Sequence, residues 1–294
     1  MSSFSEEQKK SIIKKHHNKF QKSRLNKIKT VTLRKLLGKN PYLYASRNIS
    51  TPDKLINSLL TDFLTSSEET MFGEDFFESL GLEISGGVVS TGQGTDFSIE
   101  QDSEIHVYSF KSGPNIQNAS AAQKQGEEFT ETSQRLYKTK KRFDPVRIHG
   151  YGKTSSLANK KTPYRKIAGQ AAWQELTGCS DFHIMINEVI SQESVHYAAS
   201  YQEEYEKKLA DLTNQFNLNF PSKNGKIDWS SVTEFNSGIK SKGKKLKSSN
   251  FKKLLISLQQ EPIQRQGPLL DEAFEKWRGS LEQLDDVCVI GVRV

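Results

Sequence analysis

Two short stretches and one turn decide how this chain folds: Thr95-Asp96-Phe97-Ser98-Ile99-Glu100, Glu104-Ile105-His106-Val107-Tyr108-Ser109-Phe110-Lys111 and the closing Ser112-Gly113-Pro114-Asn115. Successive side chains of a strand point to opposite faces, so this alternation predicts a hairpin with one polar and one apolar face. If the chain reverses near Asp102, Asp96 lies across from Ser109, and Lys111 lies on the diagonal. We therefore expect an acid and a lysine to meet on one face of a sheet, beside a Gly-Pro break.

An Asp and a Lys on the solvent face of a hairpin are in most proteins a solvated pair, so the rest of the chain has to decide. The chain has 294 residues, which is enough to bury a sizeable core, and its hydrophobic content is 34%. No apolar run approaches the roughly 18 residues of a membrane span, and the first residues lack the hydrophobic stretch of a secretory signal. Cys179 and Cys288 stand far apart, which predicts free thiols and a cytoplasmic location.

The charge of the chain is unevenly distributed. Residues 1–47 contain thirteen Lys or Arg and two Glu, a local balance of +11, whereas the whole chain carries +7. A second basic run falls between Asn236 and Gln260, a stretch without any acid, and comprises Lys240, Lys242, Lys244, Lys245, Lys247, Lys252 and Lys253. Two such blocks favour a polyanionic partner, and phosphate backbones are the commonest of these, so the pattern predicts nucleic-acid binding.

Hydrophobic periodicity and breaking residues indicate the order of the elements. Before the hairpin we expect helices over residues 5–38, 52–65 and 66–81 and a strand over 82–90. After it we expect helices over 120–142, 163–178, 200–216 and 269–284, strands over 146–151, 182–190 and 287–294, and irregular chain over 217–250. This order predicts a mixed α/β layer with helices on both faces rather than a doubly wound sheet.

The same observations divide the chain into three regions. Residues 1–65 form a basic helical N-terminal region, and residues 66–200 form the core that contains the hairpin. Residues 201–294 form a helical, lysine-rich region, which we expect to pack on nucleic acid or to recognise it.

The span from Phe72 to Ile190 resembles the catalytic core of the PD-(D/E)XK nucleases, in particular the type II restriction endonucleases. The resemblance rests on a helix carrying Glu78, then a strand-turn-strand unit carrying Asp96 and Lys111, then a further helix. Three runs are similar to runs in several such enzymes: Lys111-Ser112-Gly113-Pro114-Asn115, Tyr151-Gly152-Lys153 and Tyr164-Arg165-Lys166-Ile167-Ala168-Gly169-Gln170-Ala171-Ala172-Trp173. The resemblance implies a restriction-endonuclease-like fold, in which helices flank a mixed central sheet on both faces. It also implies added helical segments at the N-terminus and in the C-terminal region.

The resemblance also implies hydrolysis of DNA phosphodiesters with Mg²⁺. This ion polarises a phosphoryl oxygen, lowers the pKa of the attacking water and takes hard oxygen ligands, usually one or two carboxylates. Asp96 would be the first carboxylate, and the backbone carbonyl of Phe110 would be another ligand. Lys111 would position or deprotonate the water and offset the charge that grows in the transition state.

One departure from the family pattern matters for the metal. Ser109 stands where the pattern has an acid two residues before the lysine. The resemblance implies that a second carboxylate comes from elsewhere, with Glu78 as first choice, Glu74 one turn earlier and Glu127 as the fallback. Some members supply it from the next helix, at a spacing that in this chain falls on Gln123, Lys124 and Gln125.

Polar and basic side chains after the hairpin are the expected DNA contacts. Asn and Gln suit adenine, whereas Arg and Lys suit guanine and phosphates. Several of these residues surround the predicted start of a helix, where the helix dipole also attracts phosphates. The candidates are Asn115, Gln117, Asn118, Lys153, Lys160, Lys161, Arg165, Lys166 and Gln170.

Taken together, the chain is predicted to cut a short duplex DNA sequence as a homodimer whose two-fold symmetry matches a palindromic site. We expect a companion DNA methyltransferase in the same system, without direct contact. Two other interpretations stay open: a repair or recombination nuclease that reads DNA structure, and a non-catalytic DNA-binding protein with a nuclease-like fold. Ser109 is the strongest argument for the last of these.

Overall fold

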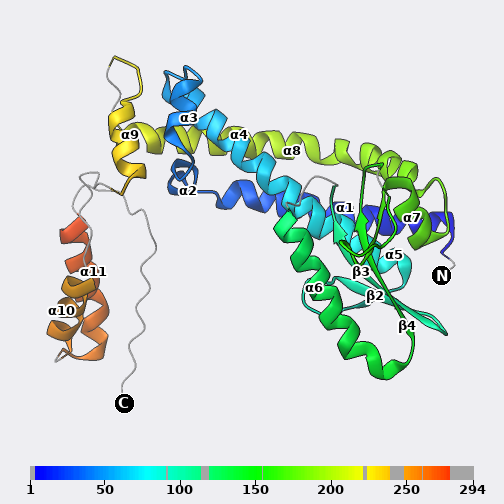
Figure 1. Cartoon of the computed structure of the whole chain (residues 1–294). Helices are drawn as coiled ribbons and strands as arrows, with labels where there is room; N and C mark the ends of the chain where they lie inside the picture. Colours follow the sequence, from blue (N-terminus) through cyan, green and yellow to red (C-terminus); the bar gives the residue numbers. More distant parts are fainter. Residues whose placement is uncertain are drawn as a thin grey trace. The chain divides into compact units, whose positions relative to one another are not determined.

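The computed structural model describes residues 4–90, 92–113, 119–153, 155–220, 224–238, 248–259 and 261–278 (Figure 1). The chain forms two compact units that interleave along the sequence. One comprises Met1–Val31 and Leu60–Asp211, and the other comprises Thr32–Leu59 and Leu212–Val294. The three regions predicted from the sequence follow the chain order and are therefore a different division from these units.

The first unit contains the sheet and the helices that cover it. Its helical elements are α1 (Glu6–Thr30), part of α4 (Pro52–Met71), the π-helix η1 (Phe72–Glu78), α5 (Ser79–Ser85), α6 (Ala119–Leu136), the 3₁₀ turn η2 (Tyr137–Thr139), α7 (Gly169–Thr177) and part of α8 (Phe182–Asn219). Its strands are β1 (Val88–Val89), β2 (Phe97–Glu100), β3 (Glu104–Lys111), β4 (Arg142–His149) and β5 (Arg165–Ala168).

The elements named in the second unit, among the residues that the structure describes, are all helices. Besides the remaining parts of α4 and α8, it contains α2 (Leu33–Leu37), α3 (Pro41–Ser46), α9 (Trp229–Asn236), α10 (Ser248–Leu258) and α11 (Ile263–Arg278). Across the described chain, no helix combines the length and the apolar composition that a membrane crossing requires.

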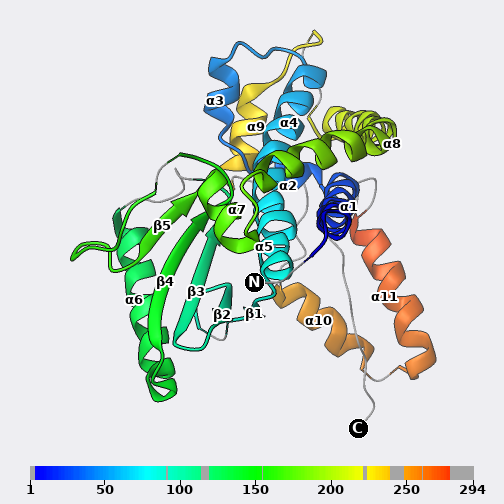
Figure 2. The same ribbon diagram turned by 90° about the vertical axis from the view of Figure 1, so that its right-hand side faces the viewer.

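The five strands are ordered β1-β2-β3-β4-β5. β1, β2 and β3 pair antiparallel, whereas β3, β4 and β5 pair parallel. Phe97 is paired with Tyr108, and Tyr108 is paired with Val146, so the hairpin and the parallel strands share one register. Figure 2 shows α6 on one face of this sheet and α5 and α7 on the other. The predicted mixed sheet with helices on both faces is confirmed.

Each face of the sheet has its own apolar layer. The layer beneath α5 and α7 contains Tyr108, Phe110, Val146, Ile148, Phe76, Phe77, Leu80 and Trp173. Here the Trp173 indole N–H donates to the Gly150 carbonyl at 2.9 Å, so the buried indole is fully satisfied. The layer beneath α6 is smaller and contains Ile105, Val107, Phe129 and Tyr164. The end of β3 therefore emerges between two packed layers.

Helix α1 is held by its apolar side, although its sequence is dominated by lysines. Ile13 and Ile28 are fully buried and Phe20 nearly so. Its basic side chains pair with acids of the same unit, as Lys10–Glu6, Lys14–Glu193, Lys15–Glu83, Lys19–Asp75, Arg24–Glu68 and Lys29–Glu204. Exposed pairs stabilise little, so packing anchors the helix. Some of the basic residues that the sequence predicts to bind a polyanion are thus paired with acids of the protein itself.

The structure corrects one predicted strand and the start of one predicted helix near the site. The segment 182–190, predicted as a strand, is the first part of helix α8, and its buried residues Phe182, Ile186 and Val189 follow helical spacing. A short apolar run cannot be assigned from periodicity alone. The helix predicted to start at Pro163 begins at Gly169, because residues 165–168 join the sheet as β5.

Upstream of the hairpin, the predicted helix boundaries also differ. Ser66 does not begin a new helix, since α4 continues through η1 and α5 without a break. This continuous segment ends at Gly86, whose φ of 68° is the left-handed conformation that suits glycine at a helix C-terminus. Residues 82–85, predicted as strand, are therefore helical, and only Val88–Val89 pair with the sheet. Near the N-terminus, residues 5–38 form two helices that break at Val31–Thr32.

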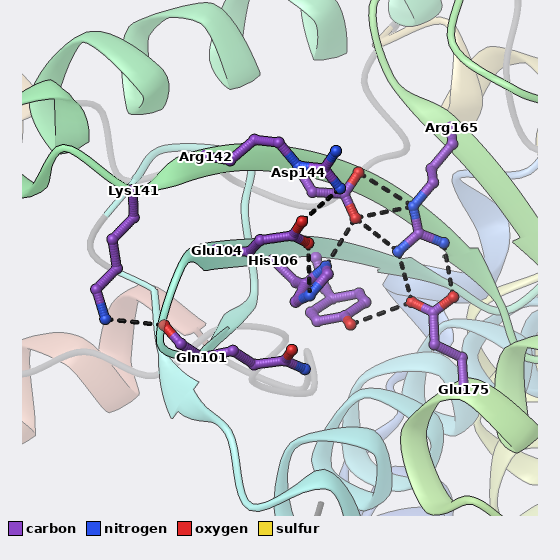
Figure 3. Close-up of polar contacts among 9 residues, drawn as sticks. Gln101, Glu104, His106, Lys141, Arg142, Asp144, Arg165 and Glu175 are labelled. Atoms are coloured by element: carbon purple, nitrogen blue, oxygen red, sulfur yellow. Dashed lines mark hydrogen bonds and ion pairs between the residues drawn. The ribbon is translucent and has the colours of Figure 1, made fainter.

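A buried ion network ties β3, β4, β5 and α7 together (Figure 3). The Arg165 guanidinium lies 2.7 Å from the Asp144 carboxylate and 2.6 Å from the Glu175 carboxylate. The His106 Nδ1–H donates to Asp144 at 2.7 Å, and the Tyr108 hydroxyl donates to Glu175 at 3.1 Å. Burial by itself raises the pKa of Asp144, but the hydrogen bonds from Arg165 and His106 outweigh it and lower the pKa below its usual value.

We expect Asp144→Asn to destabilise the protein at pH 7 by about 2–4 kcal/mol, because it leaves Arg165 incompletely paired. The folded-state pKa of Asp144 lies below the unfolded-state value, so its ionic contribution is complete above about pH 4 and is lost as the pH falls further. Urea unfolding of variant and wild type at pH 7 and at pH 3 should therefore show a smaller difference at pH 3.

Glu131→Gln is the matched control, because Glu131 is an exposed partner of Arg135 one helical turn away. We expect this variant to stay within about 0.5 kcal/mol of wild type at both pH values. A difference for Asp144→Asn that is equally large at pH 7 and pH 3 would contradict the assigned role.

Candidate active site

The hairpin register brings Asp96 and Lys111 together. Because Phe97 is paired with Tyr108, the next position places Asp96 beside Ser109, and the Asp96 N–H donates to the Tyr108 carbonyl at 2.8 Å. The Lys111 Nζ atom lies 3.9 Å from Asp96 Oδ2. The predicted meeting of an acid and a lysine on one sheet face is therefore present in the fold.

The Asp96 carboxylate is also held by the backbone. Its Oδ2 atom accepts a hydrogen bond of 2.5 Å from the Phe110 N–H. Burial raises the pKa of Asp96, whereas the Lys111 charge and the Phe110 hydrogen bond oppose the rise. The negative charge of Glu128 adds to the rise. The result is a fixed, largely desolvated carboxylate with one cationic neighbour.

Glu78 is the second carboxylate that the fold brings to this pair. It ends the π-helix η1, a type of helical segment that is frequent at functional sites. Burial raises the pKa of Glu78 to about 7, the charge of Asp96 raises it further, and that of Lys111 opposes the rise. Glu78 therefore interacts electrostatically with both members of the pair.

Glu74 and Glu127, the other candidates for the second carboxylate, differ from Glu78 in how far they are exposed. Glu74 and Glu127 are both exposed. Glu127 accepts a hydrogen bond of 3.0 Å from the Gln123 amide, one turn earlier on α6. Glu128, the next residue, faces inward with a side chain only 16% exposed, and it is the acid of α6 whose charge reaches Asp96.

Ser109 is joined to α6 by a buried amide. Its hydroxyl donates to the Gln125 side-chain oxygen at 2.8 Å, and the Gln125 amide N–H donates to the Gly94 carbonyl at 2.9 Å. Gln125 is one of the three residues at the spacing from which related enzymes supply a carboxylate. In this chain the position holds a neutral glutamine, whose two hydrogen bonds connect β3 and the turn before Asp96 to α6. These two hydrogen bonds form a clamp at Gln125.

The turn that leads into β2 needs a glycine. Gly94 has a φ of +70°, and a Cβ added there would overlap the Glu128 carboxylate. Only glycine combines this backbone conformation with so close an approach. The turn is therefore packed directly beneath α6, and this contact sets where Asp96 enters the sheet.

Most of the predicted DNA contacts lie around β5. Lys153, Lys160 and Lys161 are exposed in the segment between β4 and β5. Lys166 lies within β5 with its Nζ atom 5.7 Å from the centre of the Tyr164 ring. Gln170 is exposed at the start of α7, where its amide donates to Gln174. Asn115, Gln117 and Asn118 lie outside the described residues.

Arg165 requires a correction. The sequence predicts a DNA contact at a helix start, but Arg165 lies in β5 and its guanidinium makes five hydrogen bonds to Asp144 and Glu175. We therefore assign Arg165 to the framework of the sheet rather than to DNA contact. Its partners lie 21 residues before it and 10 residues after it, so no local pattern reveals them.

Arg147 is a buried cation that sequence reasoning missed. It lies on β4 between Ser109 of β3 and Lys166 of β5, and it is 1% exposed. Within the described residues its Nε and Nη2 atoms have no hydrogen-bond partner, and burial lowers the pKa of its guanidinium. An arginine in an alternating strand pattern is typical of a solvent-facing position, so the sequence offered no signal for this burial.

A mixed sheet in which an acid, a lysine and a second carboxylate meet at the end of the central strand has the layout of a type II restriction endonuclease. The family model described as type II restriction endonuclease EcoO109I matches residues 7–197, and the chain belongs to this family. It is accordingly a site-specific deoxyribonuclease that acts on DNA, from a family that generally uses a divalent metal. The predicted resemblance is confirmed. A search of curated proteins gives no match.

Replacing Gln125 tests whether this clamp holds the site together. Gln125→Ala leaves the buried Ser109 hydroxyl without its partner and removes the hydrogen bond to the Gly94 carbonyl. We expect a loss of about 1–3 kcal/mol in the free energy of unfolding. Gln123→Ala, on the exposed side of the same helix, is the control and should cost less than about 0.5 kcal/mol. Urea unfolding measures both, and equal losses would rule out a clamp at Gln125.

Proposed function

We propose that this enzyme hydrolyses duplex DNA with Mg²⁺ as its cofactor, held by Asp96, Glu78 and the Phe110 backbone carbonyl, with Lys111 beside the reacting phosphate. The 3.9 Å approach of Lys111 to Asp96 at the end of β3 is the observation that carries the proposal. The electrostatic influence of both groups on Glu78 supports the choice of the second carboxylate.

The donor set fits a hard divalent cation. The N–H and C=O groups of one residue in a strand point to the same side, so the carbonyl of Phe110 faces the side where its N–H meets Asp96. Within the residues that the structure describes, no three His, Cys, Asp or Glu side chains form a cluster suited to a metal. A site of two carboxylates and a carbonyl suits Mg²⁺, which keeps several waters.

When bound, Mg²⁺ supplies polarisation of the phosphoryl oxygen and activation of water. In hydrolysis the water oxygen forms a bond to phosphorus, one P–O ester bond breaks, and the departing oxygen takes up a proton. The Lys111 ammonium orients the water and offsets negative charge on the phosphoryl oxygens in the transition state. The Phe110 N–H and Lys111 hold the Asp96 carboxylate in one orientation, which keeps this geometry ready before DNA arrives.

The DNA-binding surface extends from this site along the segment between β4 and β5. We assign phosphate and base contacts to Lys153, Lys160, Lys161, Lys166 and Gln170, because the first three are exposed and basic and the last two stand beside them on β5 and α7. Asn115, Gln117 and Asn118 follow Lys111 directly in the chain and complete the proposed set. The proposed working form is a cytoplasmic homodimer on a palindromic site, in a system that includes a DNA methyltransferase.

The first experiment is incubation of the purified protein with plasmid DNA. We expect discrete fragments with Mg²⁺ and none after EDTA. Lys111→Ala should still shift duplex DNA in a gel but cleave at least about 100-fold more slowly, since it removes a charge that stabilises the transition state. Lys138→Ala, in the exposed 3₁₀ turn η2, should cut like wild type. Undiminished cleavage by Lys111→Ala would remove that lysine from the mechanism.

The choice between Glu78 and Glu127 is tested by paired substitutions. Glu78→Gln keeps the shape of the side chain but removes a ligand charge, and we expect cleavage to fall by on the order of 100-fold and to need more Mg²⁺. Glu127→Gln, on the exposed face of α6, should match wild type in cleavage rate and Mg²⁺ requirement. The opposite result, with only Glu127→Gln impaired, would move the second ligand to α6.

A further inference from the structure

Tyr151 stands at the end of β4, directly beside the chain that leaves Lys111. Beyond the last paired residues of β3 and β4, two further backbone hydrogen bonds join the chains that leave these strands. The Gly150 N–H donates to the Lys111 carbonyl at 3.0 Å, and the Tyr151 N–H donates to the Ser112 carbonyl at 3.2 Å. The backbone of Tyr151 is thus fixed relative to the proposed catalytic lysine.

Tyr151 lies beside the candidate site because the chains that leave β3 and β4 stay together. Lys111 is paired with His149, which precedes Tyr151 by two residues. The chain bends at Gly150 and Tyr151, and the N–H groups of both residues face the segment that leaves β3 directly after Lys111.

The ring of Tyr151 lies across Gly113. A Cβ added to Gly113 would stand 2.3 Å from both the Cζ and the hydroxyl oxygen of Tyr151, so the absent side chain makes room for the phenol. Gly113 is held in place because its carbonyl accepts a hydrogen bond of 2.8 Å from the His149 ring. The hydroxyl therefore lies over the second residue after Lys111, the residue at which β3 ends.

Despite this fixed backbone, the Tyr151 side chain is 58% exposed. No described residue forms a hydrogen bond with its hydroxyl. An exposed, positioned hydroxyl that has no hydrogen-bond partner among the described residues is suited to a phosphate oxygen. Tyrosine hydroxyls are regular phosphate donors in protein–DNA complexes, where such contacts set the register of the duplex.

We propose that the Tyr151 hydroxyl donates a hydrogen bond to a phosphate that neighbours the scissile one, and that it positions the DNA strand for attack. This inference rests on the proposed function, because the site at Asp96 and Lys111 defines which phosphate is scissile. It makes Tyr151 a positioning residue, and it accounts for Gly113, whose lack of a side chain lets the phenol lie over the end of β3.

The test compares Tyr151→Phe with wild type on a duplex oligonucleotide that carries the mapped cleavage sequence. We expect Tyr151→Phe to bind this duplex about tenfold more weakly, with Ca²⁺ in place of Mg²⁺ to prevent cleavage. Tyr137→Phe is the matched control, because Tyr137 is 83% exposed in the 3₁₀ turn η2, and it should bind like wild type.

Single uncharged methylphosphonate substitutions then identify the phosphate. Wild type should bind more weakly when a methylphosphonate replaces one particular phosphate beside the cut. The same replacement should not weaken binding by Tyr151→Phe any further. At every other phosphate, the replacement should weaken binding by both proteins equally. Equal affinity of Tyr151→Phe and wild type, or a methylphosphonate profile unchanged by the variant, would overturn the inference. Tyr151→Ala binding weakly while Tyr151→Phe binds like wild type would also overturn it, because the ring rather than the hydroxyl would then matter.

The two proposals fail separately. A wild-type protein that does not cut plasmid with Mg²⁺ would contradict the proposed metal-dependent function. A wild type that cuts, accompanied by a Tyr151→Phe variant that binds and cuts equally well, would contradict only the role of Tyr151.

Discussion

The register between β2 and β3 is the constraint on which the site depends. Pairing of Phe97 with Tyr108 puts Asp96 beside Ser109 and within 3.9 Å of Lys111. A slip of one residue would turn every side chain of β2 to the other face and carry Asp96 into an apolar layer. Both faces oppose such a slip. The rings of Phe97 and Tyr108 stack at 4.9 Å on one side, and on the other α6 ties β3 to the turn before Asp96.

Opposite charges gather around β3 and its parallel neighbours. Asp96 and Glu78 supply negative charge in a desolvated setting, and burial raises the pKa of both carboxyl groups. Lys111 and Lys166 supply positive charge from β3 and β5, with Arg147 buried between their strands. Burial removes water from these charges, and the protein alone compensates for that loss only in part. Binding sites for ions and phosphates are commonly built in this way.

How far the site could be predicted depends on how local its determinants are. The meeting of Asp96 and Lys111 follows from strand alternation and one short turn, so the hairpin pattern was sufficient. The position of Glu78 relative to Glu127 depends on a π-helix and on how deeply each helix packs, which no short motif encodes. The ion pairs of Arg165 could not be predicted, because its two carboxylate partners come from β4 and α7. The segment 182–190 was misassigned because buried helices and buried strands share an apolar composition.

The sequence by itself determined the polar and apolar faces of the hairpin, the mixed α/β class and the resemblance to restriction endonucleases. These depend on side-chain periodicity and on the order of short motifs, which are properties of neighbouring residues. Only the tertiary structure decided which charges are committed to partners, as at Arg165, and which lie exposed at the surface, as at Lys153. The reason is physical: ion pairing and burial act through space between segments that are distant in the chain, so they exist only once the sheet and its helices have packed.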